Sequence, residues 1–209
     1  MKKNLILNFG RNFYYVLIAI WFLGCVPENS PVLDNELDTE FSESLDIDPE
    51  SFLPNFRTNT PAQNKAIAEM RAATAKYQRV EIAEENGYQL GSACVTRPGL
   101  GGMGYHYVNY ALIDLDIDPR NPEVLLYEPQ KNGTLRLVAA EFVVPAIPWH
   151  MTHDDDDPPT FEGQVFDDHR DFTKGGPPFP HYQLHVWIWK HNPNGIFTQY
   201  NPNVNCDFQ

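Results

Sequence analysis

The chain has 209 residues, of which 28 are acidic and 15 are basic, so its formal net charge is −13 at pH 7. This acidity argues against binding to nucleic acid and against electrostatic attachment to an anionic lipid surface. The sequence also lacks a Gly-x-Ser-x-Gly motif, which argues against a serine hydrolase of that type.

The N-terminal 24 residues have the pattern of an export signal. Two lysines and an arginine precede an apolar run over 13–23, an order that is typical of a signal peptide. The run is shorter than the roughly 20 apolar residues that a membrane-spanning helix needs. The Gly24–Cys25 pair resembles a bacterial lipobox. We therefore expect a signal peptide over 1–24 and an exported cell-envelope protein, lipid-anchored at Cys25 or, if the signal is cut elsewhere, secreted.

An acidic segment follows the expected anchor. Between Val26 and Thr60 there are nine acidic residues and one basic residue, and high net charge with few large apolar residues is typical of disordered chain. We expect a solvated tether over 25–60. The remaining 61–209, about 150 residues, suit one domain with a single core.

The domain begins with a predicted helix over 61–86. Thr60 is a suitable N-cap, Pro61 occupies the first helical position, and Gln63 completes a capping box. Gly87 can take the left-handed conformation that ends a helix. Apolar or small side chains recur at helical spacing, at Ile67, Met70, Thr74, Tyr77 and Val80. This stripe predicts a helix packed on the core.

After the helix the pattern becomes extended. A glycine-rich stretch, 101–104, predicts a flexible approach to a strand over 105–110. The alternating aspartates of 114–118 resemble a calcium loop, but Pro119 stands where an EF-hand needs glycine and Leu125 stands where it needs glutamate. We interpret 114–118 as a polar turn.

A hairpin is predicted from two strands, 123–129 and 134–144, around an Asn-Gly turn. A two-residue turn would place Val124 opposite Glu141 and Glu128 opposite Leu137. Glu128 and Glu141 then lie on an otherwise apolar face, where a buried carboxylate needs a partner. The next segment, 145–180, is predicted to be irregular, as a lid, a binding loop or disordered chain. Within it the histidines and aspartates of 150–157 are an alternative metal-binding cluster.

The last strand divides into two faces, because successive side chains of a strand point to opposite sides. Tyr182, Leu184, Val186 and Ile188 form an apolar face, whereas His181, Gln183, His185, Trp187 and Trp189 form a mixed face of imidazoles and indoles. A turn at 192–195 predicts a partner strand over 196–200. The fold class expected from these elements is α+β, an N-terminal amphipathic helix on a mainly antiparallel sheet.

The mixed face suggests a binding site whose metal ligands come from several strands. His181 and His185 are roughly 13 Å apart on a regular strand, too far for both to bind an ion at about 2.0–2.1 Å. His181 is therefore expected at the rim. His185 is expected to meet ligands from other strands, for which His106, Glu128 and Glu141 are the candidates. Imidazole and carboxylate together favour Zn or Cu. The alternative is that both histidines are ordinary buried residues.

A small-molecule ligand could also occupy this face. The candidate ligand-binding residues are Tyr105, Tyr107, Glu128, His181, Trp187 and Trp189. The two indoles would serve as a platform for an aromatic, lipid or glycan ligand. The alternative is that they are core residues beneath a helix.

Cysteine usage agrees with export. With Cys25 assigned to lipid, Cys94 and Cys206 remain as an even pair in an oxidising compartment, which predicts a disulfide between them. Two separate buried thiols are the alternative.

Several ordered motifs form a recognisable pattern. They are Glu85-Asn-Gly-Tyr88, Gly102-Met-Gly-Tyr-His-Tyr-Val-Asn109, Pro122-Glu-Val-Leu-Leu-Tyr-Glu-Pro129, Leu135-Arg-Leu-Val-Ala-Ala-Glu141, His181-Tyr-Gln-Leu-His-Val-Trp-Ile-Trp-Lys190 and Asn201-Pro-Asn-Val-Asn-Cys206. Over 65–206 the chain resembles an uncharacterised family of exported bacterial proteins. The resemblance implies a single exported domain and carries no activity.

The sequence thus supports three hypotheses. The first is an envelope domain with a metal-binding pocket at His106, Glu141 and His185, in which Glu141 acts as ligand or base if the protein is an enzyme. The second is a non-catalytic binding protein for a small aromatic, lipid or glycan ligand. The third is a structural envelope protein. None of them involves nucleic acid, and the membrane is a partner only through the lipid.

Overall fold

The computed structural model describes residues 59–209, apart from the side chain of residue 174. The expected export signal, the anchor at Cys25 and the tether up to residue 58 lie outside the described residues. Within 59–209, no helix is both long enough and apolar enough to cross a membrane.

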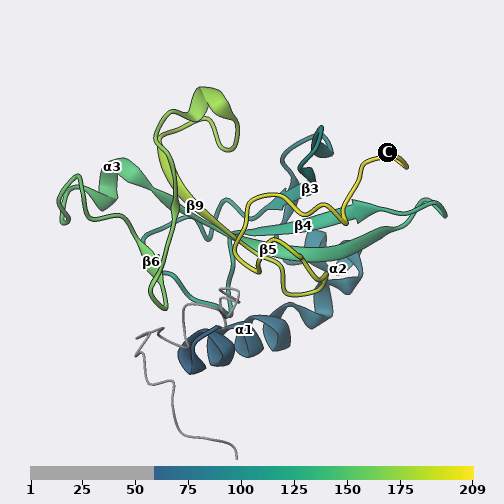
Figure 1. Ribbon diagram of the computed structural model, residues 1–209, viewed down its shortest axis with the longest axis horizontal. Coiled ribbons are helices and arrows are strands. Elements are labelled where there is room, and N and C mark those ends of the chain that lie inside the picture. Colours follow the sequence, from purple (N-terminus) through teal and green to yellow (C-terminus); the bar gives the residue numbers. More distant parts are fainter. Residues whose placement is uncertain (1–58) are drawn as a thin grey trace, which may run out of the picture. The chain divides into compact units, whose positions relative to one another are not determined.

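The expected α+β class with a mainly antiparallel sheet is confirmed. Over 59–209, seven strands form one sheet in the order β1-β3-β4-β5-β9-β8, with β2 paired to β3 (Figure 1). All of their pairings are antiparallel. The strands are β1 (Gln89–Leu90), β2 (Val95–Arg97), β3 (Gly101–Val108), β4 (Val124–Pro129), β5 (Leu135–Pro145), β8 (Asp167–His169) and β9 (His181–Val186). A separate hairpin joins β6 (Thr160–Phe161) to β7 (Gln164–Val165).

The first helical segment is broken where one continuous helix was predicted. It consists of α1 (Pro61–Thr74), the 3₁₀ turn η2 (Ala75–Gln78) and α2 (Val80–Glu85). The capping box at Thr60 is present, but Arg79 is extended, with φ −102° and ψ 119°. The break frees the carbonyl oxygen of Tyr77, which accepts a 2.7 Å hydrogen bond from the buried Tyr127 hydroxyl. A tertiary hydrogen bond therefore accompanies the end of the regular helix.

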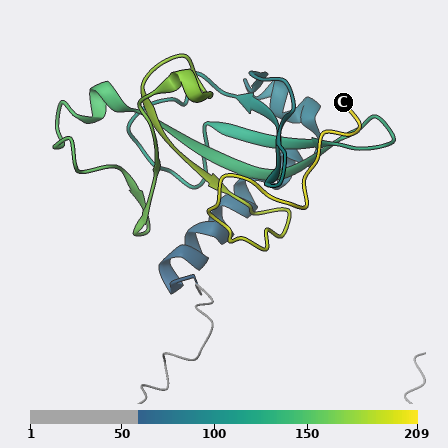
Figure 2. The same cartoon turned by 45° about the horizontal axis from the view of Figure 1, so that its top comes forward.

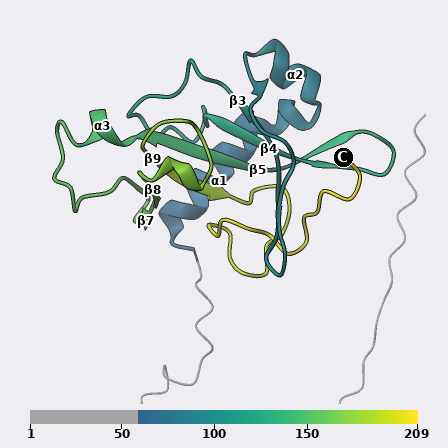
Figure 3. The ribbon, with the colours of Figure 1, turned by 90° about the horizontal axis from the view of Figure 1, so that it is seen from above.

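The sheet separates two apolar clusters. The first contains Ile67, Met70 and Tyr77 of the helical segment together with sheet residues such as Tyr127 and Phe142, and the helices lie along this face (Figures 1 and 2). The second cluster lies on the other face and includes Met103, Val124, Val138, Trp187 and Val204. The C-terminal segment contributes to this second cluster and passes beside β4 and β5 (Figure 3).

The β4–β5 hairpin has a different turn from the one predicted, but the predicted register holds near Glu141. Gln130 N donates to Thr134 O, and Gly133 N donates to Gln130 O, so the loop has three residues rather than two. This moves Glu128 opposite Arg136. A register shift between Leu126 and Tyr127 then restores the expected pairing of Val124 with Glu141. The bulge thus compensates for the longer loop.

The glycine-rich stretch is strand rather than a flexible approach. β3 begins at Gly101, and Gly102 exchanges two backbone hydrogen bonds with Asn201, of 3.0 and 3.1 Å. A Cβ atom on Gly101 would collide with the backbone carbonyl of Asn201. Glycine is therefore required where the C-terminal segment crosses β3.

The 145–180 segment is less irregular than predicted. It contains the short helix α3 (Ala146–Trp149), β6, β7, β8 and the 3₁₀ turn η3 (Phe172–Lys174). β8 pairs with β9 at the edge of the sheet. The strand predicted over 196–200 is not found; instead Trp187 N donates to Ile196 O at 2.9 Å. β9 therefore has β5 and β8 as its neighbours.

The C-terminal segment is fixed at two points. The predicted disulfide joins Cys94 to Cys206 across 112 residues of sequence. Next to it, Glu128 accepts hydrogen bonds from Lys190 Nζ at 2.6 and 2.7 Å and from Asn205 N at 3.2 Å. The buried Glu128 thus has a partner in the half-buried Lys190, and its contacts with Lys190 and Asn205 hold the C-terminal segment against the sheet.

Candidate metal centre

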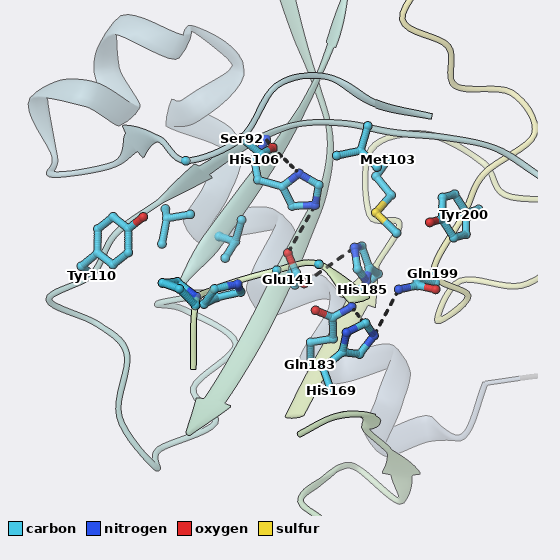
Figure 4. A pocket seen from close by; sticks show the side chains of 18 residues that line it. Ser92, Met103, His106, Tyr110, Glu141, His169, Gln183, His185, Gln199 and Tyr200 are labelled. Atoms are coloured by element: carbon cyan, nitrogen blue, oxygen red, sulfur yellow. Dashed lines mark hydrogen bonds and ion pairs between the residues drawn. The ribbon is translucent and has the colours of Figure 1, made fainter. Parts of the chain in front are cut away.

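Three strands bring together two histidines and a carboxylate. Glu141 of β5 lies directly opposite His185 of β9, and His106 reaches toward them from β3 on the same face. His106 Nε2 lies 3.7 Å from Glu141 Oε2, and His185 Nε2 lies 3.7 Å from Glu141 Oε1 (Figure 4). Among residues 59–209, this is the one group of three such side chains whose ligand atoms all lie within 4.8 Å of one another.

The distances between these atoms are too long for hydrogen bonds. An N–H···O hydrogen bond spans 2.7–3.2 Å, so 3.7 Å leaves the nitrogens and oxygens facing one another without a bond. Donor atoms at 2.0–2.1 Å from a tetrahedral Zn²⁺ are about 3.4 Å apart. The two nitrogen–oxygen separations are therefore close to those of atoms that share one ion, and all three ligand atoms lie within 4.8 Å of one another.

His185 has the least satisfied environment of the three. It is fully buried, and within the described part of the chain neither of its ring nitrogens has a hydrogen-bond partner. A buried polar group without a partner costs about 1–3 kcal/mol, and native structures rarely contain one without a functional reason. The His185 ring is therefore placed as a metal ligand would be.

Ser92 fixes the orientation of His106. The Ser92 hydroxyl donates to Ala93 O at 2.8 Å and accepts from the backbone N–H of His106 at 3.3 Å. The Ser92 oxygen also lies 3.0 Å from His106 Nδ1. Because the single hydroxyl proton is already donated to Ala93 O, the Ser92 oxygen accepts this hydrogen bond from Nδ1 as well. His106 Nδ1 therefore carries the ring proton, and the lone pair of Nε2 faces Glu141. Partners of this kind set the tautomer of metal-binding histidines.

Burial keeps the side chains of this cluster uncharged near pH 7 in the absence of an ion. Desolvation, with a contribution from Asp167, raises the pKa of Glu141 to about 8. Desolvation lowers the pKa of His106 to about 4. It also lowers the pKa of His185, with further contributions from His106 and His169. A neutral carboxyl and two neutral imidazoles form no ion pair, so no salt bridge holds these groups together.

The cluster lies at the wall of a cavity of about 190 Å³. One side of the cavity is apolar and is formed by Val95, Met103, Val108 and Val124. The other side is polar and is formed by His169, Gln183 and Gln199 (Figure 4). The cavity is also lined by Pro177, Pro178, Tyr110, Tyr200, Ser92, Gly91, Gly175 and Gly176.

Several of these residues were not identified from the sequence. His169 lies on β8, a strand hidden in the segment predicted to be irregular, and its Nε2 lies 3.0 Å from Gln183 Nε2 and 3.3 Å from Gln199 Nε2. Gln183 could have been found, since strand alternation puts it on the same face as His185. Ser92 had no local signal.

None of the six predicted ligand-binding residues lines the cavity. Tyr105 and Tyr107 belong to the helix-side cluster, because they alternate with His106 along β3. Glu128 is paired with Lys190. His181 is not at a rim: it is fully buried, with Nδ1 2.7 Å from Phe179 O and Nε2 3.2 Å from Gln183 Oε1. These are corrections to the predicted site.

The two tryptophans pack in different apolar clusters, although both border a second pocket. Regular strand geometry ends at Val186, so Trp187 and Trp189 leave the common face. Trp187 is buried in the second cluster, and its indole N–H donates to Thr198 O. Trp189 packs on the helix side and donates to Thr74 Oγ1 at 3.1 Å.

The alternative metal cluster in 150–157 is not assembled. Both ring nitrogens of His150 have protein partners, Asp154 O at 2.9 Å and the Tyr182 hydroxyl at 2.8 Å. The His153 ring stacks on Trp149 with 3.7 Å between ring centroids. These histidines are engaged in local structure.

Replacing Ser92 by alanine is expected to weaken transition-metal binding about 10-fold to 100-fold, the usual effect of losing a hydrogen bond that orients a ligand. Competition with a chromophoric chelator measures this affinity. Ser92→Thr keeps the hydroxyl and should restore most of it. Wild-type affinity in Ser92→Ala would show that the hydroxyl does not position His106.

Comparison of the chain with models of protein families, with curated proteins and with solved structures found no match.

Proposed function

We propose that this protein is an exported metalloprotein that binds one transition-metal ion through His106, Glu141 and His185. The observation that carries the proposal is the buried His185 ring, which has no hydrogen-bond partner among the described residues and faces a carboxylate and a second imidazole lone pair. A cation would be bound by all three groups at once, with His185 Nε2 as its ligand and His185 Nδ1 left as the one ring nitrogen of these three residues that still has no partner among the described residues.

The donor set supports Zn²⁺ or Cu²⁺, both of which bind imidazole and carboxylate well. Two histidines, one glutamate and a position open to solvent or substrate are typical of catalytic zinc sites. The cavity beside the cluster supplies room for such a fourth ligand. An ion there would act as a Lewis acid toward a carbonyl group or a water molecule.

Metal analysis of the tag-free protein, purified from the compartment to which it is exported, tests the proposal. We expect about one equivalent of Zn or Cu per chain, as a three-ligand site holds a single ion. A content that is far below one equivalent and that is the same in wild type, His106→Ala and His185→Ala would overturn the proposal.

Metal binding is expected to release about one proton near pH 7, because Glu141 is protonated in the metal-free protein below a pKa of about 8. The proton must leave before the carboxylate can bind, so affinity should fall about tenfold per pH unit as the pH decreases below 8. Calorimetry in two buffers of different ionisation enthalpy counts the protons. No proton release and a constant affinity between pH 6 and 8 would contradict this.

Export, membership of the exported family and attachment through a lipid on Cys25 are part of the same proposal. The Cys94–Cys206 disulfide supports export, since such bonds persist in oxidising compartments. Cys25→Ser should move the protein from the detergent phase to the aqueous phase in a detergent-partition experiment, because one or more acyl chains are lost. Cys94→Ser is the matched control and should stay in the detergent phase.

A further inference from the structure

We infer that the cavity binds a small, uncharged acyl amide whose carbonyl oxygen reaches the metal and whose N–H is accepted by Gln199. The inference rests on the proposed function, since the ion is one of the three partners of this ligand. The cavity wall supplies the other two, a polar side and an apolar side.

The polar side is held in place by contacts between its own side chains. Gln183 is 4% exposed, and its amide bridges His181 and His169 at 3.2 and 3.0 Å. Both ends of the Gln183 amide are therefore used. Gln199 contacts His169 through its nitrogen alone, at 3.3 Å. Within the described residues its Oε1 has no hydrogen-bond donor, so this oxygen is left to accept one from a ligand.

The opposite side is suited to an aliphatic group. Met103, Val108 and Val124 are each at most 6% exposed and belong to the cluster on this face of the sheet. They form an apolar part of the cavity wall, and the amide side chains form a polar part. A ligand with an amide at one edge and a short alkyl chain at the other matches both surfaces.

The charges of the lining residues and the volume of the cavity further restrict the kind of ligand that fits. Among the described residues that line the cavity there is no lysine or arginine, so an anion would find no cation there except the metal. A volume of about 190 Å³ is below the roughly 300 Å³ at which pockets for drug-sized ligands begin. The ligand is therefore neutral and has a short acyl chain.

Short hydroxamic acids test the inference, because they carry the carbonyl and N–H of an amide together with a metal-binding oxygen. The Co²⁺-loaded protein is titrated with butyrohydroxamate, N-methylbutyrohydroxamate, acetohydroxamate and azide, and the visible spectrum is followed. Butyrohydroxamate should bind about tenfold more tightly than acetohydroxamate, since it buries two more methylene groups. It should bind about fivefold more tightly than the N-methyl compound, which lacks the donor.

Two variants of one residue identify the acceptor. In Gln199→Leu the preference for the N–H compound should disappear while azide affinity stays unchanged. In Gln199→Glu, which keeps an acceptor oxygen, the preference should remain. Gln89→Leu, an exposed glutamine on β1, is the control for a glutamine-to-leucine change outside the cavity.

The outcomes separate the ligand from the metal site. If Co²⁺ and azide bind but wild type does not prefer the N–H compound, or Gln199→Leu keeps the preference, the inferred ligand is wrong and the metal site stands. If no Co²⁺ binds, both are overturned. Loss of the preference in Gln199→Leu with retention in Gln199→Glu supports the inference.

Discussion

His185→Ala is expected to weaken zinc binding by about 70-fold to 900-fold. Four ligands of a structural zinc site together provide about 10–16 kcal/mol, so one ligand contributes about 2.5–4 kcal/mol. No neighbouring side chain can take the place of His185 as a ligand, because among the described residues the cluster contains only His106, Glu141 and His185. Chelator competition measures the affinity, and thermal unfolding with and without Zn²⁺ gives an independent measure of binding.

Two further variants separate ligation from packing. His191→Ala removes an exposed histidine of the same C-terminal region and should bind zinc as the wild type does. His185→Leu fills the space of the ring and removes two buried nitrogens that have no partner among the described residues. The metal-free His185→Leu protein should be as stable as the metal-free wild type or more stable, yet zinc should no longer raise its melting temperature. An unchanged thermal shift in His185→Leu would refute the ligand role.

The strand faces on which the core residues of the candidate site lie could be predicted, because strand alternation mainly decides them. Alternation places His185 on the face opposite Leu184, and the hairpin register places Glu141 on the same face as Val124. Strand distance excludes His181 as a second ligand from β9. These inferences need only a period of two and a rise per residue, both of which the sequence pattern reveals.

The rest of the site depends on contacts that leave no local pattern. His169 reaches the cavity because β8 pairs with β9 through a three-residue register, too short to stand out in a segment rich in proline and aspartate. The tryptophans were misplaced because the strand ends at Val186, where the backbone N–H groups of Trp189 and Lys190 both turn to Val138 O. In each case a tertiary contact decides where regular structure begins or stops.

The β4–β5 hairpin shows how a correct residue pair can follow from an incorrect turn. Asn132-Gly133 predicts a two-residue turn, but Gly133 has φ +80° as the last residue of a three-residue loop. This common hairpin geometry shifts the register by one. The bulge between Leu126 and Tyr127 reverses the shift. Without the bulge, Glu141 would lie opposite Glu123 instead of Val124, and two carboxylates would share one face of the sheet.

Removing the disulfide is expected to have the largest effect on stability. Replacing Cys94 and Cys206 together by serine should lower the free energy of unfolding by about 4–5 kcal/mol, because the bond closes a loop across 112 residues of sequence. That is a large fraction of the roughly 5–15 kcal/mol that stabilises a typical domain. Urea unfolding of the double variant and of the oxidised wild type measures the difference. Cys25→Ser, which leaves the bond intact, should unfold as the wild type does.

Replacing Cys94 and Cys206 by serine should also weaken metal binding, because the disulfide and the metal site share the segment around Cys94. Cys94 is two residues from Ser92, whose hydroxyl orients His106, and the adjoining Val95 lines the cavity. In the folded double variant, zinc affinity should fall toward that of Ser92→Ala, by about tenfold. Measuring affinity well below the urea midpoint keeps the population folded. Wild-type zinc affinity in the folded double variant would show that the disulfide stabilises the domain without positioning His106.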